Sequence, residues 1–294
     1  MRTVNRRQFL AQAVGTVAIA SSVSAQEKAP LAALSGSTML PLGSTGIEVS
    51  LLGMGMGCRA WDHISDLKRK GHDAFLSVLK RAYEKRIRYY DMADFYGAHP
   101  FVKEALQSFM DRSKVTLLTK TSSREAELVR KDVERFRQEL GTDVLDVVLL
   151  HCVNDPGWPE QLKGCMDVLS DLKAKGVIRA HGISSHNMDA ASCAAETPWV
   201  DVLLERINPF GLKMDAPPEK MTPILRKAHE NKKGVLGMKI AGEGQCADRL
   251  QESLRFVLGL QCVDAMPIGF LEPGEIDSAF EHVAKCAETV SNRV

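Results

Sequence analysis

The chain has 294 residues, of which 45% are hydrophobic and 26% are charged, and its formal net charge at pH 7 is +1. This composition is ordinary for a globular protein. The near-zero charge and the lack of a long basic run argue against a general binder of the phosphate backbone, so we expect no nucleic acid as a partner. The length allows two domains of typical size or one barrel of about 250 residues.

The first 25 residues have the pattern of an export signal. A basic start, MRTVNRRQ, contains the pair Arg6 and Arg7 and precedes FLAQAVGTVAIA, an apolar run too short to cross a bilayer. The small residues Val23, Ser24 and Ala25 then offer a cleavage position. The pattern is typical of a twin-arginine signal. It predicts the twin-arginine export machinery as a partner, no stable membrane anchor, and a periplasmic or secreted protein that is exported folded. An uncleaved amphipathic N-terminus is the alternative.

Seven cysteines are present, and none of them forms a C-x-x-C pair. An odd number without such pairs argues against a cysteine metal site and against a full disulfide framework, so we expect no metal. Several of these cysteines lie within apolar runs, where a thiol acts as a small hydrophobic group. The pattern suits a chain that folds in a reducing cytosol.

Residues 26–38 are expected to be a linker, and residues 39–294 a single domain in which strands and helices alternate. Nearly continuous apolar runs, as expected for parallel strands buried on both faces, predict eight strands. These runs span residues 49–57, 88–93, 114–121, 144–152, 178–185, 201–208, 234–241 and 263–270. Apolar residues at helical spacing predict helices over 124–140 and 159–175. The first of these helices places five apolar residues on one face: Leu128, Val129, Val133, Phe136 and Leu140.

The eightfold alternation predicts an α/β fold, namely a (β/α)8 TIM barrel. Gly141, Gly176 and Gly234 stand where helices are expected to end, and a glycine there supplies the left-handed residue that ends a helix. The segment MLPLGSTGIEV contains a Ser-Thr-Gly turn. It predicts an N-terminal β-hairpin that closes the bottom of the barrel.

Ionisable residues stand at the ends of three consecutive predicted strands. Asp91 ends the second strand and Tyr96 lies in the loop after it, while Lys120 and His151 end the third and fourth strands. Each residue has an ordinary explanation alone, as a turn cap, a packed ring, an ammonium reaching solvent or a core histidine. Barrel chemistry occurs at the carboxyl ends of the strands, so the four together predict an active site.

These residues stand in motifs that resemble the aldo-keto reductase family over residues 39–285. The opening LGSTGIEVSLLGMG is similar to the start of that family, and DMADFYG matches its D-x-A-x-x-Y-G motif. TKTS, LDVVLLHC and IRAHGISSHN resemble the segments that follow. The resemblance implies an NAD(P)-dependent oxidoreductase that reduces an aldehyde or ketone to an alcohol.

In that chemistry a nicotinamide supplies hydride and Tyr96 donates a proton to the carbonyl oxygen. A free tyrosine has a pKa of about 10, so we expect the ammonium of Lys120 to lower the pKa of Tyr96. Asp91 is expected to supply the counter-charge of Lys120. His151 is expected to hydrogen-bond and orient the substrate oxygen.

The resemblance also implies cofactor contacts, in which this chain departs from the family in part. Ser184 matches a serine that holds the nicotinamide amide, Ser185 replaces the asparagine beside it, and Asn187 follows. Asn208 matches another amide-binding position. Met238 and Lys239 replace the aromatic residue that usually stacks on the nicotinamide. Ile268 and Gly269 resemble the loop around the pyrophosphate.

The phosphate preference stays open between NADP and NAD. The segment FLEPGEIDSAFE carries Glu272 and Glu275 where the family often has a base for the 2′-phosphate. Carboxylates there favour a free ribose hydroxyl. A variant of this function keeps the cofactor bound after export and recycles it within one active site.

The substrate is poorly specified by the sequence. Trp61 and Trp158 are candidates for the walls of a substrate pocket, although half-buried loop aromatics explain them equally well. The chain has no long C-terminal loop after the last predicted helix, which predicts an open mouth for a bulky or polar small-molecule carbonyl or alcohol, such as a sugar. We expect a monomer. The alternative function is a nicotinamide-binding regulatory or interaction protein with little turnover.

Overall fold

The computed structural model describes residues 34–291, so the predicted export signal lies outside the described part of the chain. Eight parallel strands form one sheet in the order β10-β3-β4-β5-β6-β7-β8-β9. Their bounds are β3 Leu52–Gly55, β4 Tyr89–Asp91, β5 Thr116–Thr121, β6 Leu145–Val153, β7 Ile178–Ser185, β8 Val202–Arg206, β9 Gly234–Met238 and β10 Met266–Gly269. The sheet closes where Leu236 of β9 bridges Ala265, just before β10. The predicted (β/α)8 barrel is therefore confirmed.

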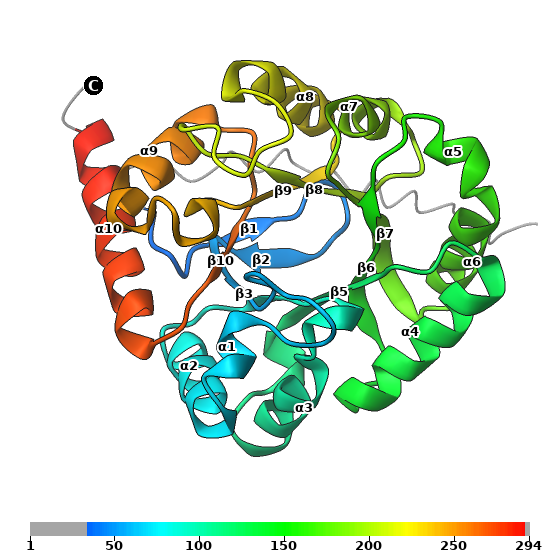
Figure 1. Cartoon of the computed structure of the whole chain (residues 1–294), viewed down its shortest axis with the longest axis horizontal. Helices are drawn as coiled ribbons and strands as arrows, with labels where there is room; N and C mark the ends of the chain where they lie inside the picture. The colour runs from blue at the N-terminus through cyan, green and yellow to red at the C-terminus, as the bar shows by residue number, and fades with distance from the viewer. Residues whose placement is uncertain (1–33, 292–294) are drawn as a thin grey trace, which may run out of the picture.

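A helix follows each strand, and the helices form a ring around the barrel (Figure 1). The ring consists of α2 His72–Glu84, α3 His99–Ser108, α4 Ala126–Leu140, α6 Lys163–Ala174, α7 Met188–Glu196, α8 Pro218–Glu230, α9 Leu250–Leu260 and α10 Pro273–Ser291. Two short helices, α1 Asp66–Arg69 and α5 Trp158–Gln161, lie in the connections. Among the described helices, none combines the length and the apolar character needed to cross a membrane.

The predicted hairpin is present as β1 Met39–Pro41 and β2 Glu48–Ser50, which pair antiparallel. Its apolar residues Leu42, Ile47 and Val49 are fully buried in one cluster with inward-facing residues of the barrel strands. The Ser44 N–H donates to the Lys232 carbonyl, just before β9 begins. The hairpin thus closes the amino-terminal end of the barrel.

The last residues of the expected linker also belong to the fold. Ser35 and Thr38 form a hydrogen-bonded turn, and the Gly36 carbonyl accepts from the N–H of Leu52 at the start of β3. Residues 35–38 are therefore part of the folded domain.

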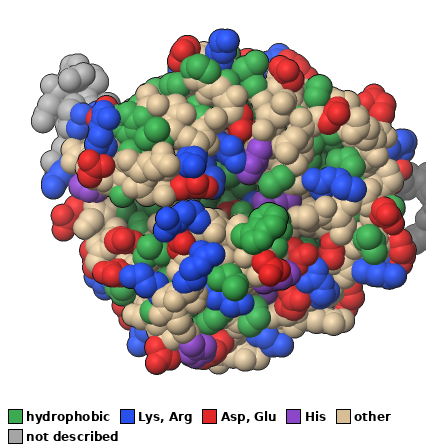
Figure 2. Space-filling view, viewed as in Figure 1, with side chains coloured by type: hydrophobic (Ala, Val, Ile, Leu, Met, Phe, Trp, Pro, Cys, Tyr) green, Lys and Arg blue, Asp and Glu red, His purple; other side chains and the backbone are tan. Residues whose placement is uncertain are grey.

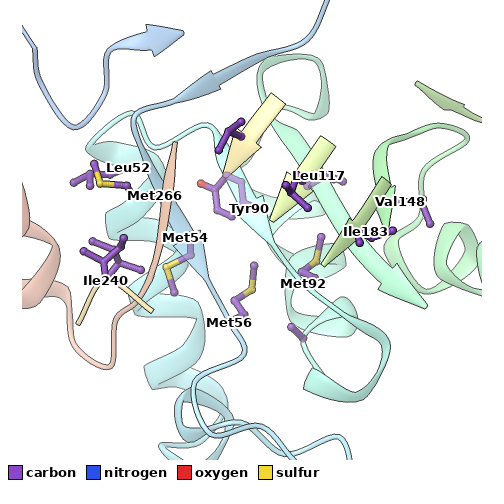
Figure 3. Packing of buried hydrophobic residues seen from close by; sticks show 14 of the residues in the cluster. Leu52, Met54, Met56, Tyr90, Met92, Leu117, Val148, Ile183, Ile240 and Met266 are labelled. Carbon is purple, nitrogen blue, oxygen red and sulfur yellow. The ribbon is translucent and has the colours of Figure 1, made fainter. Parts of the chain in front are cut away.

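Apolar residues pack on both faces of the sheet, as the continuous apolar runs predict. One cluster fills the inside of the barrel, and a larger one lies between the strands and the helices. In the larger cluster, Met54, Met56 and Met92 lie near one another beside Tyr90 (Figure 3). Unbranched thioether side chains adapt to irregular gaps of this kind.

Three local predictions need correction. Six of the eight strands are shorter than their apolar runs, whereas β7 coincides with its run and β6 is displaced from its run by one residue. Leu128 is 43% exposed, since it lies at the edge of the stripe formed by the other four apolar residues of α4. Gly141 and Gly176 have left-handed backbones as predicted, but Gly234 does not; Lys232, with φ 63°, takes that conformation instead.

Candidate active site

The ends of β4, β5 and β6 bring three of the four predicted catalytic residues together, because these strands are neighbours in the sheet. Lys120 is almost fully buried and donates hydrogen bonds to Asp91 Oδ1 and to the Met92 carbonyl, both at 2.7 Å. His151 is buried beside them at the end of β6. The predicted Asp91–Lys120 ion pair is therefore present in the structure.

Tyr96 reaches this group from the loop between β4 and α3. Residues Asp94–Tyr96 form a 3-10 turn that ends at Gly97, which has a left-handed backbone with φ 67°. A Cβ at Gly97 would lie 2.0 Å from the His63 carbonyl oxygen, so no side chain fits there. On the other side, a Cβ at Gly57 would lie 2.2 Å from the Tyr96 ring. Two glycines thus fix the loop and leave room for the phenol.

The Tyr96 hydroxyl lies 3.5 Å from His151 Nε2. The Lys120 ammonium lies 4.9 Å from the centroid of the Tyr96 ring, and its hydrogen bonds go to Asp91 and Met92 rather than to the phenol. Phenol, imidazole and ammonium therefore face one small region at the barrel rim. An oxygen atom bound there could contact the phenol and the imidazole together.

The predicted lowering of the Tyr96 pKa is wrong for this structure. Burial, followed by the negative charge of Asp91, raises the pKa of Tyr96 well above its ordinary value of 10.0. The ammonium of Lys120 is paired with Asp91 and so does not offset the loss of solvation. The phenol therefore holds its proton firmly at neutral pH.

Burial is also the largest cause of the pKa shifts of Lys120, Asp91 and His151. It lowers the pKa of Lys120 and raises that of Asp91, while the attraction between the two charges opposes both shifts. Burial and then the charge of Lys120 lower the pKa of His151 to about 2. His151 is therefore a neutral imidazole at physiological pH, able to donate from one nitrogen.

A pocket beside Tyr96 contains four of the eight predicted cofactor residues. Its wall consists of the ends of β3, β4, β9 and β10 and the loops that follow them: Gly55, Gly57, Cys58, Asp91, Tyr96, Met238, Lys239, Ile240, Ala241, Glu243, Gly244, Pro267, Ile268 and Gly269. Figure 2 shows a hollow at the centre of this face of the molecule, with histidine and charged side chains around it.

The pocket fits a nicotinamide nucleotide in its chemistry. Glycines leave parts of its wall without side chains, and a Cβ at Gly244 would meet no atom within 4 Å. Met238 and Ile268 offer apolar surface for a ring, and Lys239 offers a cation for a phosphate.

Three other predicted cofactor residues use their side chains in hydrogen bonds within the protein. The Ser185 hydroxyl is bonded to the backbone of Asn187, and the Asn187 side chain caps α7. The Asn208 amide donates to the carbonyls of Leu212 and Lys239, and its oxygen accepts two N–H groups of the same loop. The Ser185 hydroxyl, the Asn187 side-chain oxygen and the Asn208 amide are thus engaged within the protein, and cofactor binding by these three residues stays a prediction.

The Ser184 side chain can still make the predicted hydrogen bond to a nicotinamide amide. Its hydroxyl oxygen accepts from the N–H of Cys152, and the hydroxyl proton stays available for another acceptor. Ser184 stands two strand positions beyond Gly182 and four beyond Ala180, which belongs to the inner cluster. It therefore faces the inside of the barrel.

Neither tryptophan belongs to the wall of the pocket beside Tyr96. Trp158 is only 1% exposed and packs against Trp199, with ring centroids 6.0 Å apart, so its assignment to a substrate pocket is wrong. Trp61 is 79% exposed and is not among the residues of the pocket beside Tyr96.

The region of Glu272 also differs from the prediction, because a basic residue from another part of the chain lies beside it. Lys70, at the end of α1, donates to Glu272 Oε1 at 3.0 Å. This contact joins residues far apart in the chain, and the segment around Glu272 cannot reveal it.

Several residues of the site were not predicted. Phe95 stacks on His151, with centroids 4.8 Å apart, and Arg124 donates to the carbonyls of His151 and Cys152. Glu243 pairs with Lys239. Of these contacts, only the Lys239–Glu243 ion pair has a signal in the sequence, namely opposite charges four residues apart. All seven cysteines are free, and the described residues contain no cluster of metal-ligating side chains.

Comparisons with known proteins give one consistent result. The model of the aldo/keto reductase family matches residues 52–256. Among curated proteins, the uncharacterized oxidoreductase YqkF of Bacillus subtilis is 25% identical over 203 residues, which are 63% of this chain and 60% of YqkF. The NADH-specific methylglyoxal reductase of Escherichia coli is 27% identical over 177 residues, 51% of this chain and 52% of the reductase. The chain thus matches little more than half the length of these relatives.

Solved structures match over more of the chain. A proposed aldo-keto reductase from Pseudomonas aeruginosa has a TM-score of 0.70 and 25% identity, and covers 85% of this chain and 96% of its own. The aldo-keto reductase AKR11C1 from Bacillus halodurans, in its holo form, has a TM-score of 0.69, 17% identity, and coverages of 86% and 96%. The second likeness concerns the fold alone.

Proposed function

Because the chain belongs to the aldo/keto reductase family, we propose that it is an NAD(P)-dependent oxidoreductase that reduces an aldehyde or ketone to an alcohol. The observation that carries this proposal is the 3.5 Å approach of the Tyr96 hydroxyl to His151 Nε2, above the buried Asp91–Lys120 pair. A nicotinamide, when bound, supplies the hydride.

The side chains of Tyr96 and His151 bind the carbonyl oxygen of the substrate in this proposal. The carbonyl oxygen lies between the Tyr96 hydroxyl and His151 Nε2 and accepts a hydrogen bond from each. Because His151 stays neutral, its Nε2 can carry a proton for this bond. Tyr96 gives its proton to the oxygen as negative charge develops there. The ammonium of Lys120, 4.9 Å from the ring centroid, then stabilises the phenolate.

The pocket residues Met238, Lys239, Ile268 and Gly269 are the proposed cofactor contacts, together with Ser184 for the amide. Both NADH and NADPH stay candidates. Glu272 favours a free ribose hydroxyl, but Lys70 beside it offers a cation for a phosphate. Fluorescence titration with each nucleotide measures the preference directly.

Replacing Tyr96 with phenylalanine tests the mechanism. We expect Tyr96→Phe to lower kcat by about 10²- to 10⁴-fold, the usual contribution of a general acid. The ring remains, so the dissociation constants of NADH and NADPH should change little. The assay follows nicotinamide absorbance with a panel of small aldehydes.

The matched control is Tyr83→Phe, which removes the hydroxyl of a tyrosine that accepts from the Asp111 N–H and is not part of the pocket wall. It should keep wild-type kcat. A Tyr96→Phe protein as active as the wild type would contradict the proposed role of the phenol.

A further inference from the structure

The end of β6, where His151 lies, is irregular. Between Leu150 and Val153, three steps along β6 match two steps along β7, so β6 contains one extra residue and forms a β-bulge. Cys152, inside this bulge, has a left-handed backbone with φ 52°. His151 therefore stands where the regular pairing of its strand ends, and other contacts have to fix its backbone.

Side chains supply hydrogen bonds to the backbone at this bulge. The Cys152 N–H donates to the Ser184 hydroxyl at 3.1 Å. One terminal nitrogen of Arg124 donates to the carbonyls of both His151 and Cys152, the latter at 3.3 Å. The pairing of β6 with β5 stops at Thr121, three residues before Arg124. The guanidinium therefore takes over where the hydrogen bonds of β5 end, and satisfies two backbone acceptors.

Arg124 also binds the backbone of its own loop, between β5 and α4. Its other terminal nitrogen donates to the carbonyls of Ser122 and Ser123, at 3.1 and 3.3 Å. Within the described part of the chain, these four hydrogen bonds all go to carbonyl oxygens. A planar guanidinium presents several donors in fixed directions, which an ammonium does not. Arg124 thus joins the loop after β5 to the end of β6.

Helix α4 holds the loop that carries Arg124. Asp132 of this helix accepts from Thr121 Oγ1 at 2.5 Å and from Ser123 Oγ at 2.7 Å. Arg135, three residues later, donates to Asp132 at 2.8 Å. The loop therefore has a fixed backbone from which Arg124 reaches the end of β6.

The same helix holds the turn of Tyr96. Arg135 also donates to Asp94 Oδ1 at 2.8 Å, and Asp94 begins the 3-10 turn that ends in Tyr96. One helix thus supports both sides of the proposed oxygen site. It reaches the phenol through Asp94, and the imidazole through the loop of Arg124.

We propose that Arg124 is a positioning residue for His151. Its guanidinium fixes the bulge at the end of β6 and thereby keeps the imidazole within reach of the substrate oxygen and of the Tyr96 hydroxyl. This inference rests on the proposed function, and it adds a residue that does not belong to the pocket wall.

A double-mutant cycle with His151 tests this role. A displacement of about 1 Å at reacting groups can cost about 10²-fold in rate, so we expect Arg124→Ala to lower kcat by about 10- to 10²-fold. Because Arg124 acts through His151, the same substitution in a His151→Gln protein should change kcat by less than about twofold. The dissociation constants of NADH and NADPH should stay within about twofold of wild type, because no contact of the pocket wall is removed.

Two further variants separate this role from general effects. Arg130→Ala is the matched control, because Arg130 lies on α4 and pairs with Asp171 at 3.0 Å. Its loss should leave kcat within about twofold of wild type, as for a surface ion pair. Arg124→Lys keeps the charge but lacks the fixed fork of donors, so most of the loss in kcat should remain. This variant enters the same cycle if the alanine variant does not fold.

The imidazole of His151 also reports its surroundings without a substrate. In protein labelled with ¹⁵N at histidine, its ring resonances are identified by their loss in His151→Gln. Arg124→Ala and Arg124→Lys should shift these resonances, whereas Arg130→Ala should leave them in place.

Three results would overturn the inference. The loss in kcat could be absent, or equal with and without His151, which would show that Arg124 does not act through the imidazole. Arg124→Lys could keep full kcat, which would assign the effect to charge alone. The His151 resonances could stay unchanged in both Arg124 variants. If the wild-type protein reduces no aldehyde of the panel, the proposed function fails, and the resonances still decide whether Arg124 positions His151.

Discussion

At the scale of single residues, burial determines the protonation state of His151. Its pKa falls to about 2 in the folded protein, whereas an exposed histidine has the ordinary value of 6.5. Between these values the unfolded chain binds a proton that the folded chain does not. The free energy of unfolding must therefore decrease as the pH falls below 6.5. At pH 5 the contribution of one such histidine is a loss of about 2 kcal/mol.

Urea unfolding at pH 8 and pH 5 tests this expectation. The wild type should lose more stability between the two pH values than His151→Gln, by about 2 kcal/mol. His72→Gln is the control, because His72 is exposed and its carboxylate neighbours Asp73 and Glu104 raise its pKa. That variant should not reduce the loss. Equal losses in the wild type and His151→Gln would mean that His151 takes up a proton in the folded protein.

The pair of Lys120 and Asp91 shows which part of the site a sequence can reveal. The side chains at the ends of neighbouring strands were predicted to meet, and they do so at 2.7 Å. The sign of the Tyr96 pKa shift was not predictable, because it depends on how much water the folded loop excludes. Residue types at strand ends identify the partners, but the burial of those partners is a property of the whole fold.

At the scale of elements, the loop between β4 and α3 depends on close contact with the loop after β3. Gly97→Ala places a Cβ 2.0 Å from the His63 carbonyl oxygen in a left-handed conformation. Gly46→Ala, in the hairpin, has almost the same φ, 70° against 67°, and meets no atom within 4 Å. The two variants share the backbone strain of about 1–2 kcal/mol and differ in the collision.

We therefore expect both alanine variants to lose similar stability from backbone strain, and only Gly97→Ala to lose activity. A shift of about 1 Å in the Tyr96 loop can lower kcat/KM by about 10²-fold. Urea unfolding and steady-state kinetics on the same preparations separate the two effects. Comparable kcat/KM values for both variants would show that the contact with His63 does not position Tyr96.

Loops were predicted less well than strands, for a physical reason. The apolar runs and the alternation with helices determine the barrel, because each strand is buried on both faces. Loop side chains depend on distant partners instead. Trp158 is buried by its contact with Trp199, and Lys70 reaches Glu272 across 202 positions of the chain. Neither contact has a local pattern.

At the scale of the whole molecule, contact between the first and last strands closes the barrel. The last strand, β10, pairs with the first strand of the barrel, β3, so the barrel closes only when the whole chain is available. We propose that residues 1–25, outside the described part of the chain, direct this finished barrel to the twin-arginine machinery. Its destination would be the periplasm or the medium.

Replacing Arg6 and Arg7 with lysine tests this proposal, because lysine keeps the charge and removes the paired guanidinium groups. The wild type should be found in the periplasmic fraction of a bacterial host, and the double variant should stay in the cytosol as folded protein. Immunoblots of cell fractions measure the distribution. A double variant exported as efficiently as the wild type would contradict this route.

The hairpin at the amino-terminal end has a consequence for the order of events in turnover. Leu42, Ile47 and Val49 cover that end, and the pocket beside Tyr96 lies at the opposite end, among the loops that follow β3, β4, β9 and β10. We therefore expect the nucleotide and the carbonyl compound to enter from the same face, and the one that binds deeper in the pocket to bind first and leave last.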